Sequence, residues 1–222
     1  MTAQTWTTVA DLATALGTLV LAVATFSAIR SANLSARIAQ RALLEAMRPV
    51  LMPSRRDDAP LKVNFGDRKF VQVPGGGAAG EVGGGDGSMG EETTVVYLAV
   101  GLRNAGNGIA VLHGWRFYPE WGRDEQHAPL EEFRRQARDL YIPAGDIGFW
   151  QGAFRDTDDP QYEAARSVIE AREPWTVELL YGDHEGGQRV VSRFTLLPRR
   201  DSADGWFASV SRHWNIDRPD PR

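Results

Sequence analysis

The sequence predicts a mainly β protein that carries a transmembrane and stalk helix at its N-terminus. Residues 12–29 run for 18 positions without a charge or a proline, and helix-forming residues continue to Met47. Beyond Pro49, about seven short apolar runs are separated by turn residues, which is typical of an antiparallel β-sandwich with two short helices in its connections. The chain has no cysteine, so the immunoglobulin-like β-sandwich that we expect is an architecture without a disulfide.

Residues 1–29 are interpreted as a transmembrane anchor. A bilayer core about 30 Å thick needs roughly 20 apolar residues in a helix, and the apolar run extended back to Trp6 supplies them. A secretory signal would carry positive charge before its apolar core, whereas the only charged side chain there is Asp11. Two alternatives stay open: a signal cleaved at the small residues 22–24, and the buried core helix of a soluble protein.

The order of charges predicts the topology. The positive-inside rule places the N-terminus outside and the C-terminal domain in the cytoplasm, in an inner or plasma membrane crossed once. Through residue 56 there are six arginines against two acidic residues (+4), and beyond it 19 basic against 27 acidic residues (−8). The basic collar favours anionic lipid, and the acidic domain argues against nucleic acid as the main partner. The arginines closest to the apolar run are Arg30, Arg37, Arg41 and Arg48.

Residues 30–48 are predicted to continue the helix as a stalk, which Pro49 ends. Small residues recur along the helix at alternating steps of three and four and draw a seam on one side. The hypothesis is a parallel homodimer through this seam, because small residues let helices approach closely in lipid. The alternative is chance, since the first 50 residues hold 12 alanines. The seam consists of Ala15, Thr18, Ala22, Thr25, Ile29, Ala32, Ala36, Ala39, Leu43 and Ala46.

Residues 49–200 are predicted to form the β domain. A return strand is expected to place Ile109, Val111, Trp115 and Phe117 on one face. Residues 131–139 and 161–171 are predicted to be the two short helices. The other expected strands cover residues 61–65, 69–73, 94–102, 147–154, 175–181 and 190–196.

Residues 74–92 are predicted to be a flexible glycine-rich loop, with nine glycines between positions 75 and 90. A phosphate-binding loop would need a lysine and a hydroxyl residue after its last glycine, but Glu91 and Glu92 stand there. We therefore expect that residues 76–89 can be deleted with little loss of stability. Residues 201–222 are predicted to be a less regular C-terminal tail.

Three motifs resemble a layout that recurs in uncharacterised bacterial single-pass membrane proteins. The first is Arg48–Leu51, which reads Arg-Pro-Val-Leu after the anchor helix. The second is the turn from Leu102 to Ala110, and the third is Tyr181–Asp183, which precedes a strand. The resemblance implies a β-sandwich tethered by an N-terminal anchor helix. It implies no catalytic residues, because these motifs belong to turns and strands.

The sequence contains no catalytic signature and predicts no cofactor. Residues 183–185 (Asp-His-Glu) could bind a metal with help from elsewhere, but a hairpin turn also requires polar residues. The aspartates of residues 156–159 are interpreted as caps of the following helix, and His113 as a half-buried side chain. Tryptophans in less regular segments are the candidates for an exposed binding patch: Trp121, Trp206 and Trp214.

We expect a membrane-tethered, non-enzymatic interaction or adaptor module whose cytoplasmic β-sandwich presents loops or an edge strand to a protein partner. One alternative is a metal-dependent or hydrolytic enzyme that uses loop residues near His184. The other is an exported module that binds an envelope ligand through its aromatic side chains. Topology separates the first hypothesis from the third, and the chemistry around His184 separates it from the second.

Overall fold

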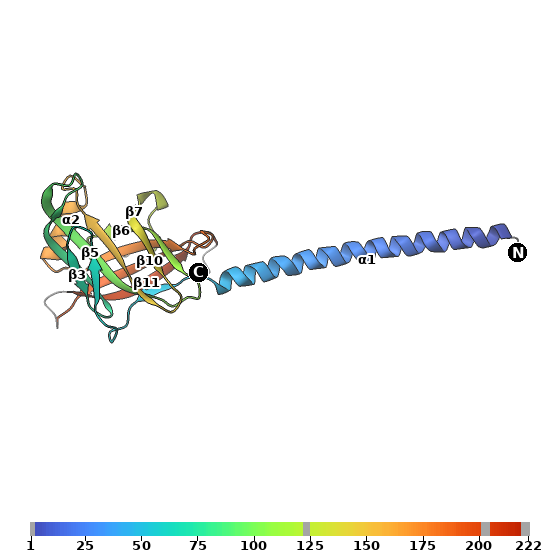
Figure 1. Ribbon diagram of the computed structural model, residues 1–222, viewed down its shortest axis with the longest axis horizontal. Coiled ribbons are helices and arrows are strands. Elements are labelled where there is room, and N and C mark those ends of the chain that lie inside the picture. Colours follow the sequence, from blue (N-terminus) through green and yellow to red (C-terminus); the bar gives the residue numbers. More distant parts are fainter. Residues whose placement is uncertain (1–2, 122–124, 201–204, 219–222) are drawn as a thin grey trace. The chain divides into compact units, whose positions relative to one another are not determined.

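The computed structural model describes residues 3–121, 125–200 and 205–218, in two units (Figure 1). The first unit, Met1–Ala46, is helix α1 (Ala3–Ala46), and the second, Met47–Arg222, is the β domain. Helix α1 continues without a break through the predicted anchor and stalk, because it contains no proline and only one glycine, Gly17. It ends three residues before Pro49, as the sequence predicts.

Helix α1 is long and apolar enough to cross a membrane, and among the described residues it is the one helix with this property. Its position near the N-terminus fits a membrane anchor and equally a signal sequence. A possible membrane association is therefore supported by the structure, whereas the side on which each end lies stays a prediction. The proposed helix seam also stays a prediction.

The β domain is an antiparallel sheet that curls strongly into half a barrel (Figure 1). The described residues form nine strands in this sheet, in the order β1-β5-β4-β11-β10-β9-β6-β7, with β8 paired to the other side of β5. The bounds of the strands are β1 (Leu51–Pro53), β4 (Gly77–Asp86), β5 (Glu92–Asn104), β6 (Ala110–Tyr118), β7 (Arg134–Ile142), β8 (Ile147–Phe154), β9 (Trp175–Gly182), β10 (Val190–Pro198) and β11 (Trp206–Asn215).

The concave side of the sheet encloses the main core. Large aromatic side chains fill it, and Trp115 packs edge-on against Trp150 and Phe154. Helix α2 (Tyr162–Glu170) contributes its buried face to the same core. The strand expected at residues 94–102 is confirmed as part of β5, and its four alternate apolar residues all belong to this core: Val96, Leu98, Val100 and Leu102.

A second, smaller core lies on the other face of β5. The hairpin of β2 (Leu61–Asn64) and β3 (Phe70–Val73) packs there against Val95, Tyr97 and Ala99. Strand β5 is thus buried on both faces, which explains its nearly continuous apolar sequence. The predicted class, mainly β and antiparallel after a long apolar helix, is confirmed. The finer immunoglobulin-like sandwich is not shown by this curled sheet.

The prediction of a flexible glycine-rich loop is wrong for most of residues 74–92. Residues 77–86 form β4, which pairs with β5 in unbroken register from Ala78–Val100 to Asp86–Glu92. Gly80 allows helix α2 to approach closely. A Cβ there would lie 2.5 Å from Ile169 Cδ1, so the buried Ile169 side chain would have to move to admit a larger residue.

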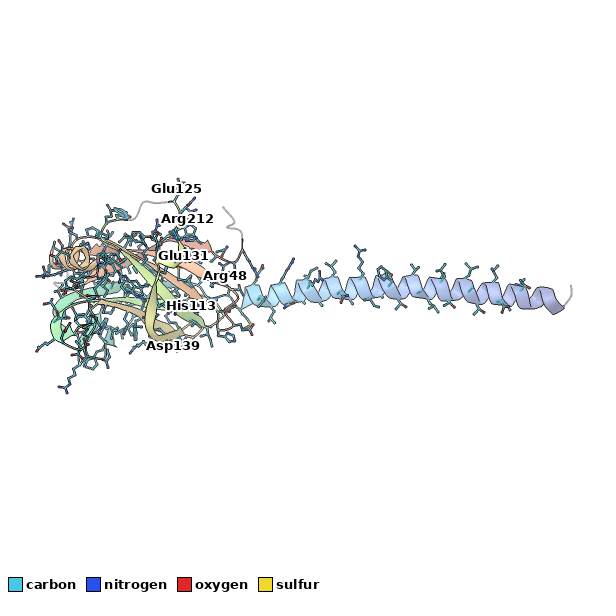
Figure 2. All side chains as sticks on the ribbon, turned by 90° about the horizontal axis from the view of Figure 1, so that it is seen from above. Arg48, His113, Glu125, Glu131, Asp139 and Arg212 are labelled. Atoms are coloured by element: carbon cyan, nitrogen blue, oxygen red, sulfur yellow. The ribbon has the colours of Figure 1, made fainter. Side chains whose placement is uncertain are left out.

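The helix predicted at residues 131–139 is also absent. A short 3-10 turn, η1 (Leu130–Glu132), is followed by strand β7, and most of the chain between Glu131 and Asp139 is extended (Figure 2). The arginine-rich sequence has good helix propensity, but pairing with β6 buries Leu140 and Ile142 on one face and overrides it. The second predicted helix is confirmed as α2.

Two further predictions need correction. The described part of the C-terminal tail contains β11, which pairs with β10 along its whole length. In β6 the expected inward face shifts, because the strand bulges between Leu112 and Gly114. Before the bulge the core residues are Ala110 and Leu112, and after it Trp115 and Phe117, as expected. His113 at the bulge is exposed, not half-buried.

Candidate functional site

A groove of about 390 Å³ lies between β7 and β8. These strands follow one another along the chain, but in the described sheet β7 pairs with β6 and β8 with β5, so their other edges face each other. One side chain bridges them, since Gln136 Nε2 donates a hydrogen bond of 2.8 Å to the main-chain oxygen of Gln151. Phe65 and Gly66 beyond β2 and Trp115 of β6 complete the lining.

Strand β7 leaves regular pairing where it lines this groove. Its ladder with β6 steps from the pair Leu112–Leu140 to the pair Gly114–Arg135, so residues 136–139 have no register partner in β6. A bulge of this kind bends a strand and re-aims its side chains and main chain. The groove wall at residues 136–138 is therefore an arched segment whose main chain takes no part in the β6–β7 ladder.

Four arginines line the groove, and two of them are ion-paired. Arg134 forms a bidentate pair with Asp159, with Nη2 2.7 Å from Oδ1, and its guanidinium lies over the Phe154 ring. Arg155 Nη1 lies 2.7 Å from Asp67 Oδ2. These pairs hold the two arginines in place and neutralise their charge.

Both carboxylates stay ionised near neutral pH. Burial acts to raise the pKa of Asp67, but hydrogen bonds from Arg155 and Tyr97 outweigh burial and lower it. Burial likewise opposes ionisation of Asp159, and the hydrogen bond from Arg134 brings its pKa below the usual value. The walls of the groove are thus fixed by charge-assisted hydrogen bonds.

Arg135 and Arg138 supply the net charge of the groove. Both side chains are exposed, and no carboxylate of the described residues lies within ion-pair distance of either. Arg138 rests over the Phe149 ring, with 5.6 Å from its guanidinium carbon to the ring centroid. Because the other two arginines are neutralised by aspartates, these two leave the groove positive within a domain whose overall charge is negative.

Two amide oxygens in the groove are without partners. Gln151 is only 8% exposed, and its Oε1 has no hydrogen-bond partner among the described residues. The same holds for Gln136 Oε1, whose nitrogen is used to bridge the strands. A buried polar atom left in this state costs about 1–3 kcal/mol, and both oxygens are closed off from solvent in the observed conformation.

The three motifs of the resemblance meet at one end of the β domain. Asn104 Oδ1 accepts hydrogen bonds from the main-chain nitrogens of Val50 and Gly106, and its Nδ2 donates to the main-chain oxygens of Gly108 and Ile142. The Tyr181 hydroxyl accepts from the Leu51 nitrogen at 3.1 Å. These bonds attach the start of the β domain firmly to β5 and β9.

The approach at this end is close enough to require glycine. A Cβ at Gly108 would collide with the main-chain oxygen of Met47. Arg48, which flanks the predicted anchor, lies at the same end of the domain as His113 (Figure 2). The motifs are therefore structural, and the chain that follows α1 is built into the domain rather than hanging from it as a free linker.

A buried ion pair organises the outer face of β9 and β10. Arg193 donates to Glu178 Oε1 from Nε at 2.9 Å and from Nη2 at 2.6 Å, with both side chains almost fully buried. Glu178 Oε2 accepts from the Tyr118 hydroxyl and the Ala128 nitrogen, and Arg193 Nη2 donates to the Gln126 oxygen. The pair thereby holds residues 126–128 against the sheet. Burial, then the charge of Glu178, raises the pKa of Tyr118.

A serine and a histidine also lie together, with 2.5 Å between Ser192 Oγ and His213 Nδ1. These are the atom types of a nucleophile and its base. However, Ser192 is fully buried, and its Oγ also lies 2.9 Å from the Tyr181 hydroxyl. A substrate has no access to this oxygen in the observed conformation, so the contact serves packing between β9, β10 and β11.

The two polar segments considered as possible metal sites or helix caps, residues 183–185 and 156–159, form turns. Asp183 is buried, and its Oδ1 accepts from the Gly187 nitrogen, whereas His184 and Glu185 are exposed. Asp159 Oδ1 accepts from the nitrogen of Gln161, the residue before α2, so only part of the predicted capping is observed. Across the described residues, no group of three or more histidine or acidic side chains is arranged to hold a metal.

The predicted tryptophan patch is wrong for two of its three members. Trp206 is 1% exposed and Trp214 5%, because β11 belongs to the sheet. Trp206 Nε1 donates to the Glu173 oxygen, and Trp214 packs under the guanidinium of Arg193. Trp121 is exposed, as expected.

No family model, no curated protein and no solved structure matches this chain.

The groove residues were missed by the sequence reasoning. Residues 134–138 read Arg-Arg-Gln-Ala-Arg, and this run was assigned to a charged surface helix. Its density of arginine in an otherwise acidic domain is the signal that could have identified it. Gln151 gives no such signal, because its unpartnered oxygen depends on where β7 bulges.

Proposed function

We propose that this protein is a membrane-tethered, non-enzymatic interaction module. Helix α1 anchors the chain, its flanking arginines contact anionic lipid in the cytoplasmic leaflet, and the β domain presents the groove to a protein partner in the cytoplasm. The observation that carries the proposal is the groove itself. Two exposed arginines and two amide oxygens on adjacent strands line it, and within the described part of the chain none of these four groups has an ion-pair or hydrogen-bond partner. Sheet edges and basic pockets are common sites of protein recognition.

The attachment of the chain at the start of the β domain supports an adaptor, because Asn104 and Tyr181 hold the main-chain nitrogens of Val50 and Leu51. Such a module brings its partner to the membrane. The predicted homodimer through the small-residue seam would add a second groove to each assembly.

Replacement of both exposed arginines should abolish capture of the partner. We expect that full-length tagged protein, solubilised from membranes of its native host, co-purifies with a cytoplasmic protein that Arg135→Glu/Arg138→Glu reduces by at least about tenfold. Quantitative mass spectrometry of the two preparations measures this. Neither side chain holds the fold together, since both are exposed and without ion-pair partners.

The matched control is Arg200→Glu, which removes an equally exposed arginine outside the groove. It should leave the set of co-purifying proteins unchanged. Identical sets from the wild type and the double variant would contradict the proposed function, as would a partner located outside the cytoplasm.

A further inference from the structure

We propose that the ligand of the groove is an extended acidic segment of the partner protein, lying along the strand edges of β7 and β8. This inference rests on the proposed function and adds the chemistry of the segment that is recognised. It is argued from three independent features of the groove, which together select a polypeptide over a simple anion.

The first feature is charge. Arg135 and Arg138 are exposed, have no carboxylate partner among the described residues, and are three positions apart on one strand. A strand rises about 3.3 Å per residue, so the two Cα atoms are about 10 Å apart or less. Alternate residues of an extended peptide lie about 6.6 Å apart on one side, and the long arginine side chains can reach carboxylates at that spacing. Guanidinium groups bind carboxylates by paired hydrogen bonds, which gives the acidic preference.

The second feature is the pair of acceptors without donors. Gln151 Oε1 is buried and unpartnered, and Gln136 Oε1 is unpartnered beside it in the groove lining. A ligand reaches these oxygens only when the Gln136 side chain, which bridges the two strands, moves aside. The main-chain N–H groups of a peptide are donors that would then satisfy them, whereas phosphate at neutral pH offers mainly acceptors.

The third feature is the main chain of β7. Residues 136–139 lie outside the ladder with β6, in the arched segment that forms the groove wall. A strand edge with free main-chain groups is a template for an added strand. In the described sheet its neighbour β8 pairs with β5 alone, and Gln136 donates one side-chain hydrogen bond to the opposite edge of β8. An extended segment can therefore bond to main-chain groups as well as to side chains.

The acids of an extended ligand must lie on one side of it to face the two arginines of β7. Alternate residues of an extended chain point to opposite sides. We therefore infer a pattern in which glutamate or aspartate alternates with uncharged residues.

A direct binding measurement tests this inference. Full-length protein in nanodiscs of zwitterionic phosphatidylcholine is titrated against a fluorescein-labelled peptide of five Glu-Thr repeats, and anisotropy reports the Kd. We expect saturable binding that weakens with salt, and a Kd at least about tenfold higher for Arg135→Glu/Arg138→Glu. Arg200→Glu should bind like the wild type, and a peptide of five Lys-Thr repeats should not bind.

Two further probes separate a peptide from a simple anion. The same acidic peptide N-methylated at its threonines keeps every charge but loses alternate N–H donors, and it should bind at least about tenfold more weakly. Gln151→Leu should weaken binding of the parent peptide and leave the affinity for the N-methylated peptide unchanged. Equal binding of the two acidic peptides would overturn the inference and leave only an anion site. Full competition by inorganic phosphate, added at the same concentration of negative charge as the peptide, would overturn it as well.

Self-association is the remaining outcome. If the wild type, but not the double arginine variant, forms larger assemblies in these nanodiscs, a second copy of this chain occupies the groove and the inference is wrong. A second result would separate the two proposals. If no acidic peptide binds, but Arg135→Glu/Arg138→Glu still fails to co-purify with the cellular partner, the proposed function holds and the inference of an acidic ligand is wrong. The two proposals therefore fail separately.

Discussion

Glu178→Gln should lower the free energy of unfolding by about 3–5 kcal/mol, because it leaves the guanidinium of Arg193 buried beside a neutral partner. Glu178 is fully buried and accepts four of the hydrogen bonds described above. Its loss also releases the Ala128 nitrogen, so residues 126–128 should become sensitive to protease. Urea unfolding of the full-length protein in detergent measures the change in free energy.

The matched control is Glu132→Gln. Glu132 pairs with Arg116, but both side chains are partly exposed, so its loss should cost at most about 1 kcal/mol. The double variant Glu178→Met/Arg193→Met should be more stable than Glu178→Gln, since it buries no unpaired charge. Equal effects of Glu178→Gln and Glu132→Gln would contradict the role assigned to the buried pair.

Deletion of residues 76–89 should prevent the β domain from folding. It removes β4, which pairs with nine residues of β5 and links β5 to β11 through Ala78 and Gly77. The lost ladder, at about 0.5–1.5 kcal/mol per hydrogen bond, approaches the whole stability of an ordinary domain. Loss of the cooperative thermal transition, followed by circular dichroism, is the measurement. This result is the opposite of what the sequence alone led us to expect.

Two point substitutions distinguish a packed strand from a loose loop without removing residues. Gly80→Val should cost about 1–3 kcal/mol, because its new side chain meets Ile169 of α2. Gly84→Val should be neutral or slightly stabilising, since no atom lies within 4 Å of its added Cβ and valine favours strands. An unchanged Tm in both variants would show that residues 77–86 do not pack as described.

These glycines also explain how far the sequence could predict the fold. Strand β5 was predictable because Val96, Leu98 and Val100 alternate with residues of the opposite face. Strand β4 was not, because its Gly80 packs against Ile169, a residue nearly 90 positions away in the chain. Composition alone cannot distinguish a glycine kept for close packing from a glycine kept for flexibility.

The candidate site shows the same limit. The bulge between Leu112 and Gly114 shifts the inward face of β6 and arches β7. The pattern of apolar residues in these two strands does not predict this bulge. The arginine run at residues 134–138 was visible, but its meaning depends on aspartates that neutralise Arg134 and Arg155 and leave the other two unpaired. The long apolar helix α1, by contrast, follows from local composition and was predicted directly.

The central claim is that the groove meets a cytoplasmic protein while the chain is held in the membrane, and cross-linking in living cells tests it most directly. A photo-reactive phenylalanine analogue replaces Ala137, an exposed residue of the groove lining, in the otherwise unaltered chain. The account predicts an adduct with a cytoplasmic protein in the membrane fraction, absent when the analogue replaces Arg200 instead. No adduct at position 137, equal adducts at both positions, or an adduct with an exported protein would contradict it.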